Sequence, residues 1–405
     1  ADGDAARARA MFIAAGGRVV PADAGGALID ADVHVDGLFG TGLDRPVHGA
    51  AAALIGQLHA CGRPVLALDV PSGLDADTGA RLGMTVRAAA TICFVAWKRG
   101  LFTNDAVDCC GALELAGLDL PHPVREGVPA DAHLLDASLA RLLRPRPGNA
   151  NKSSFGHVLV VGGDTGMGGS VRLAGEAALR CGAGLASVAT RHEHVAALNS
   201  ARPELMGHGV ETTTDLVALL ERASVVAAGP GLGRGQWGRA LLDAVLASGR
   251  PQVLDADALN LLAEAPQALP AGTVLTPHPG EAARLLGCSV ADVQRDRFAA
   301  VRSIAARHAA VVVLKGAGSL VCDPRGEVGV CRWGNSGMAS GGMGDLLTGV
   351  IAALRAQGLD AWGAARLGVA MHARAGDLAA GTTPRGLLAG DLLAPLRLLA
   401  NGFSA

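Results

Sequence analysis

Trp333-Gly334-Asn335-Ser336-Gly337-Met338-Ala339-Ser340-Gly341-Gly342-Met343-Gly344-Asp345-Leu346-Leu347-Thr348-Gly349 is the stretch that decides how this chain is expected to fold. It begins as a loop rich in glycine and serine and continues into an apolar run with helical spacing, Leu346 to Leu354. A glycine loop that leads into a helix presents unpaired N–H groups at the positive end of the helix dipole. The stretch therefore predicts an anion site at a helix start, where the glycines let the backbone approach a phosphate.

Asp345 sits where this helix is expected to begin, and two interpretations of it are open. A carboxylate in the first turn of a helix can cap it. It can also act as a base that faces a ligand bound over the anion site. A second glycine cluster, Gly162 to Gly169, favours the base.

Length and composition narrow the class of protein. The 405 residues are too many for one ordinary core and indicate two domains. No apolar run approaches the ~20 residues of a membrane span. A net charge of −2 without a basic tract argues against nucleic-acid and membrane partners, and 3% aromatic residues without Tyr argue against base stacking. The expected partners are small-molecule substrates and further copies of the chain in a homo-oligomer.

The cysteine pattern indicates free thiols in a reducing compartment. No two cysteines form a C-x-x-C pair, and no His cluster completes a zinc pattern. Most cysteines have apolar neighbours, which favours burial. We therefore expect a cytoplasmic protein. The eight positions are Cys61, Cys93, Cys109, Cys110, Cys181, Cys288, Cys322 and Cys331.

Two consecutive strands near the amino terminus are each expected to end in an Asp followed by a glycine turn. His34 to Asp36 precedes Gly40 and Gly42, and Pro64 to Asp69 precedes Pro71-Ser72-Gly73. Parallel strands expose their carboxyl ends at one edge of a sheet, which is where open α/β sheets bind ligands. A further strand is expected over Ala89 to Phe94, and a short one over Arg18 to Val20 after a helix at Ala5 to Ala15.

These motifs resemble the NAD(P)H-hydrate epimerase family, through Asp36 to Leu43, Asp69 to Leu74 and Lys98 to Leu101. The resemblance implies a Rossmann-like domain that interconverts the R and S hydrates of NADH and NADPH and binds K⁺. It implies Asp36 and Ser72 as K⁺ ligands, and Asp69 as a substrate-binding acid/base. The residues implied to cradle the substrate are Gly40, Thr41, Gly42, Leu43, Asp44, Arg45 and Pro46.

The family also carries an Asn-Asn-Gly-Gly-Asp-Gly loop near its first helix, and this sequence has none. The opening residues Ala1 to Asp4 do not replace it. That loop and its flanking strand and helix supply part of the ion site and part of the substrate site. We therefore expect epimerisation by this domain to be impaired.

A weakly periodic joint spans Ala116 to Gly148. After it, the second part alternates short apolar strands with amphipathic helices. This alternation predicts an α/β domain with a mainly parallel sheet covered on both faces. The glycine loop after the first strand does not fit a Walker A motif. The strands are expected at 157–161, 184–190, 224–229, 251–255, 273–276 and 310–314.

Polar residues follow several of these strands, and each has two interpretations. Lys315, before Gly316-Ala317-Gly318, is either a surface lysine or, as we favour, a phosphate contact. His278, between two prolines, either holds a turn or contacts substrate. Asp255 and Asp257 are interpreted as caps of the next helix.

The second part resembles, over its whole length, the ADP-dependent NAD(P)H-hydrate dehydratases of the ribokinase-like superfamily. We thus expect an epimerase-like domain at 1–136 and a dehydratase domain at 137–405. The resemblance implies that Lys315, Gly316, Ala317, Gly318, Ser319 and Gly344 bind the adenine nucleotide, and that Ser170, Gly231, Gly233, His278 and Asp345 contact the hydrate. The matching motifs are Gly162–Gly163, Gly175–Arg180, Cys181–Leu185, Ala201–Glu204, Gly229–Gly233, Asp255–Asp257, Thr276–Glu281, Lys315–Ser319 and Gly341–Asp345.

The expected reaction restores NADHX and NADPHX to NADH and NADPH. Hydroxide is a poor leaving group, so the site is expected to phosphorylate the C6 hydroxyl and then eliminate phosphate. Asp345 would take the hydroxyl proton, and Mg²⁺ would bridge the phosphates. ADP as the donor, giving AMP and phosphate, comes from the resemblance. A small-molecule kinase of the same fold and a nucleotide-binding module without turnover are the alternatives.

Overall fold

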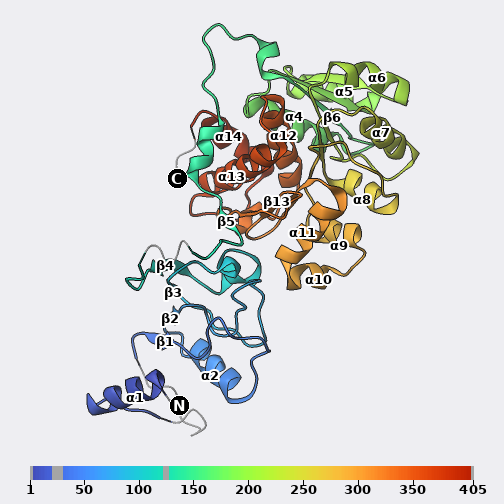
Figure 1. Cartoon of the computed structure of the whole chain (residues 1–405). Coiled ribbons are helices and arrows are strands. Elements are labelled where there is room, and N and C mark those ends of the chain that lie inside the picture. Colours follow the sequence, from blue (N-terminus) through green and yellow to red (C-terminus); the bar gives the residue numbers. More distant parts are fainter. Residues whose placement is uncertain (1–2, 21–30, 122–126, 403–405) are drawn as a thin grey trace. The chain divides into compact units, whose positions relative to one another are not determined.

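The structure is a computed structural model that describes residues 3–20, 31–121 and 127–402. Its contacts divide the chain into two compact units, Ala1–Leu101 with Asp105–Gly127, and Phe102–Asn104 with Val128–Ala405 (Figure 1). The domain boundary expected near residue 137 stays a prediction. Residues 1 and 2 of the opening stretch, and 122–126 of the joint, lie outside the described residues.

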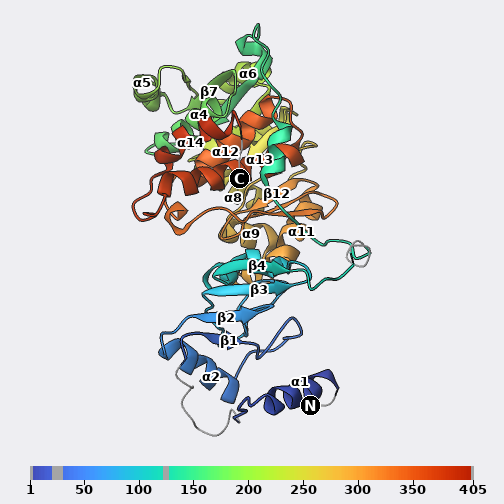
Figure 2. The same cartoon turned by 90° about the vertical axis from the view of Figure 1, so that its left-hand side faces the viewer.

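The first unit is built on a parallel sheet in the order β1-β2-β3-β4, which Figure 2 shows strand by strand. Pairing of Asp36 with Ala67 brings the carboxyl ends of β1 and β2 side by side, as the sequence predicts. The strand predicted at Arg18 to Val20 is wrong, because those residues are exposed and pair with no described strand. The elements are α1 (Asp4–Ala14), β1 (His34–Asp36), α2 (Gly49–Ala60), β2 (Val65–Leu68), β3 (Ala90–Phe94) and β4 (Ala112–Ala116).

The second unit contains a ten-stranded sheet in the order β5-β14-β13-β12-β11-β10-β9-β6-β7-β8. In this order the seven strands β12-β11-β10-β9-β6-β7-β8 are all parallel, while β13 runs antiparallel to both of its neighbours. The fold class expected from the sequence is confirmed. The strands are β5 (His133–Leu134), β6 (His157–Val161), β7 (Leu185–Thr190), β8 (Met206–Gly209), β9 (Val225–Ala228), β10 (Gln252–Leu254), β11 (Val274–Leu275), β12 (Val311–Leu314), β13 (Leu320–Cys322) and β14 (Val328–Val330).

Helices cover both faces of this sheet (Figure 1). One layer contains α4 (Gly168–Arg180), α12 (Met343–Ala356), α13 (Ala361–Ala380) and α14 (Leu393–Leu399). The other contains α6 (Thr213–Arg222), α7 (Gln236–Ala247), α8 (Ala256–Glu264), α9 (Pro279–Leu286) and α11 (Arg297–His308). Within the described residues of this unit the other α-helices are α5 (His192–Ala201) and α10 (Val290–Arg295). The short 3-10 helices described in the chain span Arg99–Phe102, Asn104–Asp108, Ala137–Leu142, Lys152–Phe155, Ser336–Met338 and Ala389–Leu392.

The close packing of α12 on α4 positions the site. Val350, Ile351 and their neighbours bury the apolar side of α12 in the main core. Gly349 is required there, because a Cβ atom at this position would overlap the carbonyl oxygen of Ala174 in α4. The start of α12 also lies against α4, because a Cβ atom at Gly342 would lie 2.5 Å from the Leu173 side chain.

All eight cysteines are free, and six are buried. Among the described helices, none combines the length and hydropathy that crossing a bilayer requires.

Candidate functional site

The glycine loop before α12 forms an open helix start. Gly342 occupies the N-cap position with φ 87°, a left-handed conformation that favours glycine. No side chain caps the helix, and within the described residues the N–H groups of Gly341, Gly342, Met343, Gly344 and Asp345 donate to no protein acceptor. These N–H groups at the positive end of the dipole are suited to hold an anion.

Asp345 is the third residue of α12, and its side chain makes no capping bond. Ser170, in the first turn of α4, lies close enough to Asp345 to favour the ionised form of its carboxyl group. Burial, and then the charge of Asp255, raises the pKa of Asp345 to about 6, against the lowering effects of Ser170 and Lys315. A carboxyl group with a pKa near neutrality is suited to proton transfer, so the geometry favours the base over the cap.

A buried ion pair lies under this helix start. The Lys315 Nζ is 2.6 Å from Asp255 Oδ1 and 3.7 Å from Glu281 Oε2. Burial lowers the pKa of Lys315, but the charges of Asp255 and Glu281 outweigh it and raise that pKa. A Cβ atom at Gly344 would lie 3.3 Å from both Lys315 Nζ and Asp255 Oδ2. Lys315 is thus no surface lysine: its side chain is 19% exposed and points into the cluster below Gly344.

Asp255 and Glu281 are the residues that the sequence interpretation missed. Asp255 occupies the N-cap position of α8, but its carboxylate makes no capping bond and accepts from Lys315 and from the Thr348 hydroxyl, at 2.9 Å. Burial raises the pKa of Asp255, yet Lys315 holds it below the usual value. Burial raises the pKa of Glu281. The signal was present, because Asp255 stands at the carboxyl end of a strand, as Asp36 and Asp69 do.

Asp257 is not a cap either. Its carboxylate accepts from the Gly233 N–H at 2.9 Å and from the Asn260 amide at 3.3 Å. The interpretation of both aspartates as helix caps was therefore wrong. Local sequence shows which residues come before a helix, whereas Lys315, Thr348 and Gly233, which donate to these carboxylates, lie far from them in sequence.

His278 holds the turn that starts α9. Its Nδ1 accepts from the N–H groups of Gly280 at 2.9 Å and Glu281 at 3.4 Å. In return the Glu281 carboxylate accepts from the His278 N–H at 2.8 Å. Burial and the nearby Lys315 charge lower the pKa of His278, which keeps the ring neutral. The turn-holding interpretation fits this geometry, and the substrate contact stays a prediction.

The loop from Lys315 to Ser319 carries a second set of open N–H groups. Within the described residues the N–H groups of Gly316, Ala317, Gly318 and Ser319 donate to no protein acceptor. Gly316 and Ala317 are exposed, so solvent or a ligand can reach them. Consecutive open N–H groups form a concavity suited to phosphate oxygens.

The glycines expected to contact the hydrate line the loops beside Ser170. A Cβ atom at Gly231 would lie 3.4 Å from the Ser170 Cβ, so the two residues are adjacent. A Cβ atom at Gly233 would lie 2.7 Å from an Asp164 carboxylate oxygen, in the glycine loop after β6. The structure thus brings Ser170, Gly231, Lys315, Gly344 and Asp345 to one edge of the sheet.

The expected ligands of the first unit also lie at strand ends. Asp36, which is 2% exposed, accepts from the Ser72 hydroxyl at 2.6 Å and from the Ser72 N–H at 2.8 Å. Asp69 has φ 68° and accepts from the Lys98 ammonium group and the Phe94 N–H. Gly40 to Pro46 form a mostly exposed turn after β1. No described group of three or more His, Cys, Asp or Glu side chains in either unit is arranged to hold a metal.

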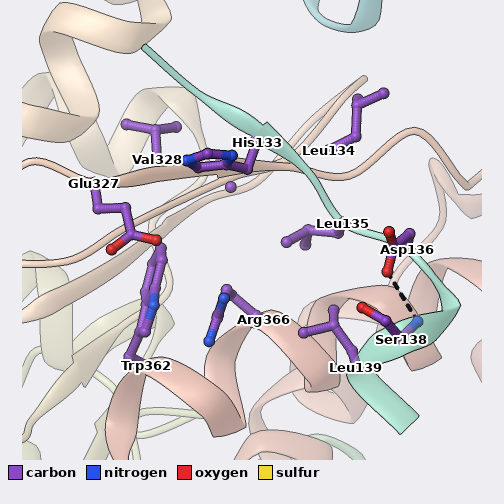
Figure 3. A pocket seen from close by; sticks show the side chains of 11 residues that line it. His133, Leu134, Leu135, Asp136, Ser138, Leu139, Glu327, Val328, Trp362 and Arg366 are labelled. Carbon is purple, nitrogen blue, oxygen red and sulfur yellow. Dashed lines mark hydrogen bonds between the residues drawn. The ribbon is translucent and has the colours of Figure 1, made fainter. Parts of the chain in front are cut away.

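A separate small cavity lies between β5, β14 and α13 (Figure 3). Its volume of about 100 Å³ falls below the few hundred Å³ that ligand pockets usually have. None of the predicted site residues lines it. Arg366, whose guanidinium stacks on Trp362 at 4.5 Å, and Glu327 and His133 border it.

A mainly parallel sheet covered by helices, with glycine loops and an open helix start at its carboxyl edge, is typical of ribokinase-like nucleotide-binding proteins. Comparison with known proteins agrees. A ribokinase-like superfamily protein of Enterococcus faecalis is 29% identical and has a TM-score of 0.63, over 68% of this chain and 97% of that one. The ADP/ATP-dependent NAD(P)H-hydrate dehydratase of Bacillus subtilis, co-crystallised with ATP/Mg²⁺, is 27% identical and has a TM-score of 0.60, over 68% of this chain and all of that one.

Family models and relatives are more specific. Residues 158–397 match the family model of NAD(P)H-hydrate dehydratase, and residues 1–100 match that of the YjeF-related protein N-terminus. The bifunctional NAD(P)H-hydrate repair enzyme of Coxiella burnetii is 49% identical over 92% of this chain and 77% of its own length. That of Escherichia coli is 43% identical over 98% and 77%. The chain belongs to the family of bifunctional NAD(P)H-hydrate repair enzymes, which confirms both resemblances.

Proposed function

We propose that the second unit dehydrates the S hydrates of NADH and NADPH with ADP as the phosphoryl donor and releases AMP and phosphate. The observation that carries this proposal is the position of Asp345. Its carboxyl group, with a raised pKa, lies at an open helix start next to a lysine held by a buried carboxylate. That arrangement combines a base with donors for a charged phosphoryl group.

In the first step Asp345 takes the proton of the C6 hydroxyl group. The hydroxyl oxygen bonds to the β-phosphorus of ADP, and the bond between that phosphorus and AMP breaks. The N–H groups of Gly341 to Gly344 and the Lys315 ammonium group stabilise the negative charge on the transferring group. Ser170, which lies beside Asp345, favours the ionised form that accepts the proton.

In the second step phosphate leaves from C6 with the electrons of the C–O bond, and a proton leaves the adjoining ring carbon C5. The ring nitrogen stabilises the positive charge that develops at C6. A dihydronicotinamide is restored, so the net change is loss of water from the hydrate and cleavage of ADP to AMP and phosphate.

The residues at this site fit Mg²⁺. In phosphoryl-transfer sites this ion is held by one or two carboxylates and by substrate phosphates rather than by a cage of protein ligands. Asp345 is the carboxylate at the helix start that would hold the ion, because both oxygens of the buried Asp255 already accept hydrogen bonds from Lys315 and Thr348. When bound, the ion would neutralise charge on the phosphates.

For the first unit we propose epimerisation of the R and S hydrates with K⁺ bound by Asp36 and Ser72. The buried Asp36 carboxylate and the Ser72 hydroxyl supply oxygen ligands, which suit a hard cation. Asp69, in contact with Lys98, would remove and return the substrate's proton. Gly40 to Pro46 would cradle the substrate. The expected impairment stays a prediction.

Two assays on the full chain test these proposals. S-NADHX with ADP and Mg²⁺ is expected to give NADH, AMP and phosphate in equal amounts. R-NADHX without nucleotide tests the first unit through the appearance of the S epimer. A stable phosphorylated product with no activity on the hydrate would favour the kinase alternative instead, and ADP binding without turnover would favour a binding module.

Location and assembly also stay proposals. Eight free cysteines and no disulfide fit the cytoplasm that we propose. The homo-oligomer that we expect is tested by the mass of the purified protein in sedimentation equilibrium.

A further inference from the structure

Arg297, the first residue of α11, is a buried cation that the reaction described above does not use. It is 1% exposed. Among the described residues no carboxylate lies within ion-pair distance of its guanidinium, and burial alone lowers its pKa to about 10. A buried charge without a counter-ion is costly. Other hydrogen-bond partners must therefore offset the cost of burying this guanidinium.

The guanidinium of Arg297 is used instead as a set of hydrogen-bond donors behind the Lys315–Ser319 loop. Its Nη2 donates to the carbonyl oxygens of Leu314 and Lys315, both at 3.3 Å. Its Nη1 donates to the Gln294 side chain at 2.8 Å. Its Nε donates to the Thr103 hydroxyl at 3.0 Å.

Thr103 continues this network to the far end of the loop. The tripeptide Phe102–Asn104 belongs to the second unit, and Thr103 is fully buried there. The Thr103 hydroxyl is the donor to two carbonyl oxygens, that of Gly318 at 2.9 Å and that of Ala317 at 3.1 Å. The Asn104 N–H also donates to the Ala317 carbonyl at 3.1 Å. The fit is close, because a Cβ atom at Gly318 would overlap the Phe102 carbonyl oxygen.

Fixing these carbonyl groups also fixes the direction of the loop N–H groups. In a trans peptide the C=O of one residue and the N–H of the next point in opposite directions. Carbonyl groups of Lys315, Ala317 and Gly318 that point toward Arg297 and Thr103 therefore turn the N–H groups of Gly316, Gly318 and Ser319 away from them. These are among the N–H groups that have no protein acceptor.

We propose that Arg297 and Thr103 are positioning residues that preorganise the N–H groups of the Lys315–Ser319 loop for the phosphates of a nucleoside diphosphate. The inference rests on the proposed function, in which this loop binds ADP. It also places a determinant of nucleotide affinity, Thr103, outside residues 158–397, which match the dehydratase family model. The nucleotide's negative charge then compensates the buried guanidinium.

The test compares two full-chain variants. Thr103→Val keeps the shape of the side chain but removes the hydroxyl, and Thr103→Ser, the matched control, keeps the hydroxyl. The Thr103 hydroxyl both donates and accepts inside a buried network. Removing such a group weakens an equilibrium that depends on the network about tenfold. We expect Thr103→Val to raise the Kd and KM of ADP about tenfold, with kcat at saturating ADP and the KM of the hydrate unchanged. Thr103→Ser should match the wild type.

A second measurement separates positioning from general stability. Amide hydrogen exchange of the peptide containing Gly316 to Ser319, without nucleotide, should be faster in Thr103→Val than in the wild type and in Thr103→Ser. An unchanged Kd for ADP in Thr103→Val overturns the inference and leaves the proposed function standing. Equal loss of kcat and of hydrate affinity also overturns it. A wild type that does not bind ADP overturns the proposed function and the inference together.

Discussion

The carboxylate of Asp255 and the ammonium group of Lys315 lie 2.6 Å apart beneath the first turn of α12, although 60 residues separate them in sequence. They meet because β10, β11 and β12 are parallel neighbours, so that the residues after β10 and β12 come to the same edge of the sheet. The lysine is thereby fixed below Gly344, where the phosphates are expected.

Asp255→Asn should destabilise the protein. It leaves the Lys315 cation buried with only the more distant Glu281 as partner, and breaking a buried pair in this way costs about 3–5 kcal/mol. The free energy of unfolding in urea measures the effect. The matched control is Asp323→Asn, a buried carboxylate whose ion-pair partner Arg325 is 81% exposed. It should cost less than about 1 kcal/mol. Equal costs would contradict the importance given to the Asp255–Lys315 pair.

Asp345→Asn should lower kcat by about 10²–10⁴-fold, the usual contribution of a general base, and leave the Kd of ADP nearly unchanged. Because burial raises the pKa of Asp345, its ionised form is disfavoured in the folded state, so the variant should be as stable as the wild type or more stable. Asp292→Asn is the control at the corresponding third position of α10, where the carboxylate does cap the helix. It should keep the rate and lose stability. Near-normal turnover by Asp345→Asn would remove the base from the mechanism.

The rate of dehydration should depend on pH through Asp345. Its pKa is raised to about 6, and only the ionised form accepts the hydroxyl proton. At limiting hydrate concentration, kcat/KM should therefore rise from pH 5 and level off above about pH 7. The stability that this group contributes has the opposite dependence: a raised folded-state pKa means that stability is lost as pH rises through about 6. A rate that is flat between pH 5 and 7 would argue against Asp345 as the base.

Asp36→Asn should raise the K⁺ concentration needed for half-maximal epimerisation at least about tenfold, since it removes the buried negative charge from the proposed ion site. Epimerisation of R-NADHX, followed over a range of KCl concentrations, measures this. Asp75→Asn is the control, because that carboxylate only accepts from the N–H groups of Asp77 and Thr78 within a turn. If both variants respond to K⁺ like the wild type, Asp36 is not an ion ligand.

Features that depend on local sequence were predictable. The glycine loop at Gly341 to Gly344, the apolar run after it, and the strands that end in Asp36 and Asp69 each carry their own signal. The structure places a helix start and two adjacent parallel strands there. Hydrophobic pattern and turn residues determine such elements over about ten residues.

Features that depend on strand order were not predictable from one sequence. The carboxylate of Asp255 pairs with Lys315, which follows a strand two positions away in the sheet. The Thr103 hydroxyl donates to the Gly318 carbonyl, more than 200 residues later in the chain. The β13–β14 hairpin was also missed, although Asp323-Pro324-Arg325-Gly326 between its strands is a recognisable turn signal. Short strands of three residues carry too little pattern to be separated from loops.

The central claim is that the C6 hydroxyl oxygen leaves as part of a phosphate. S-NADHX labelled with ¹⁸O in that hydroxyl, incubated with ADP, Mg²⁺ and the full chain, tests it directly by mass spectrometry of the released phosphate. The account predicts one ¹⁸O atom in each phosphate and none in AMP. Unlabelled phosphate, with the label in water, would contradict it.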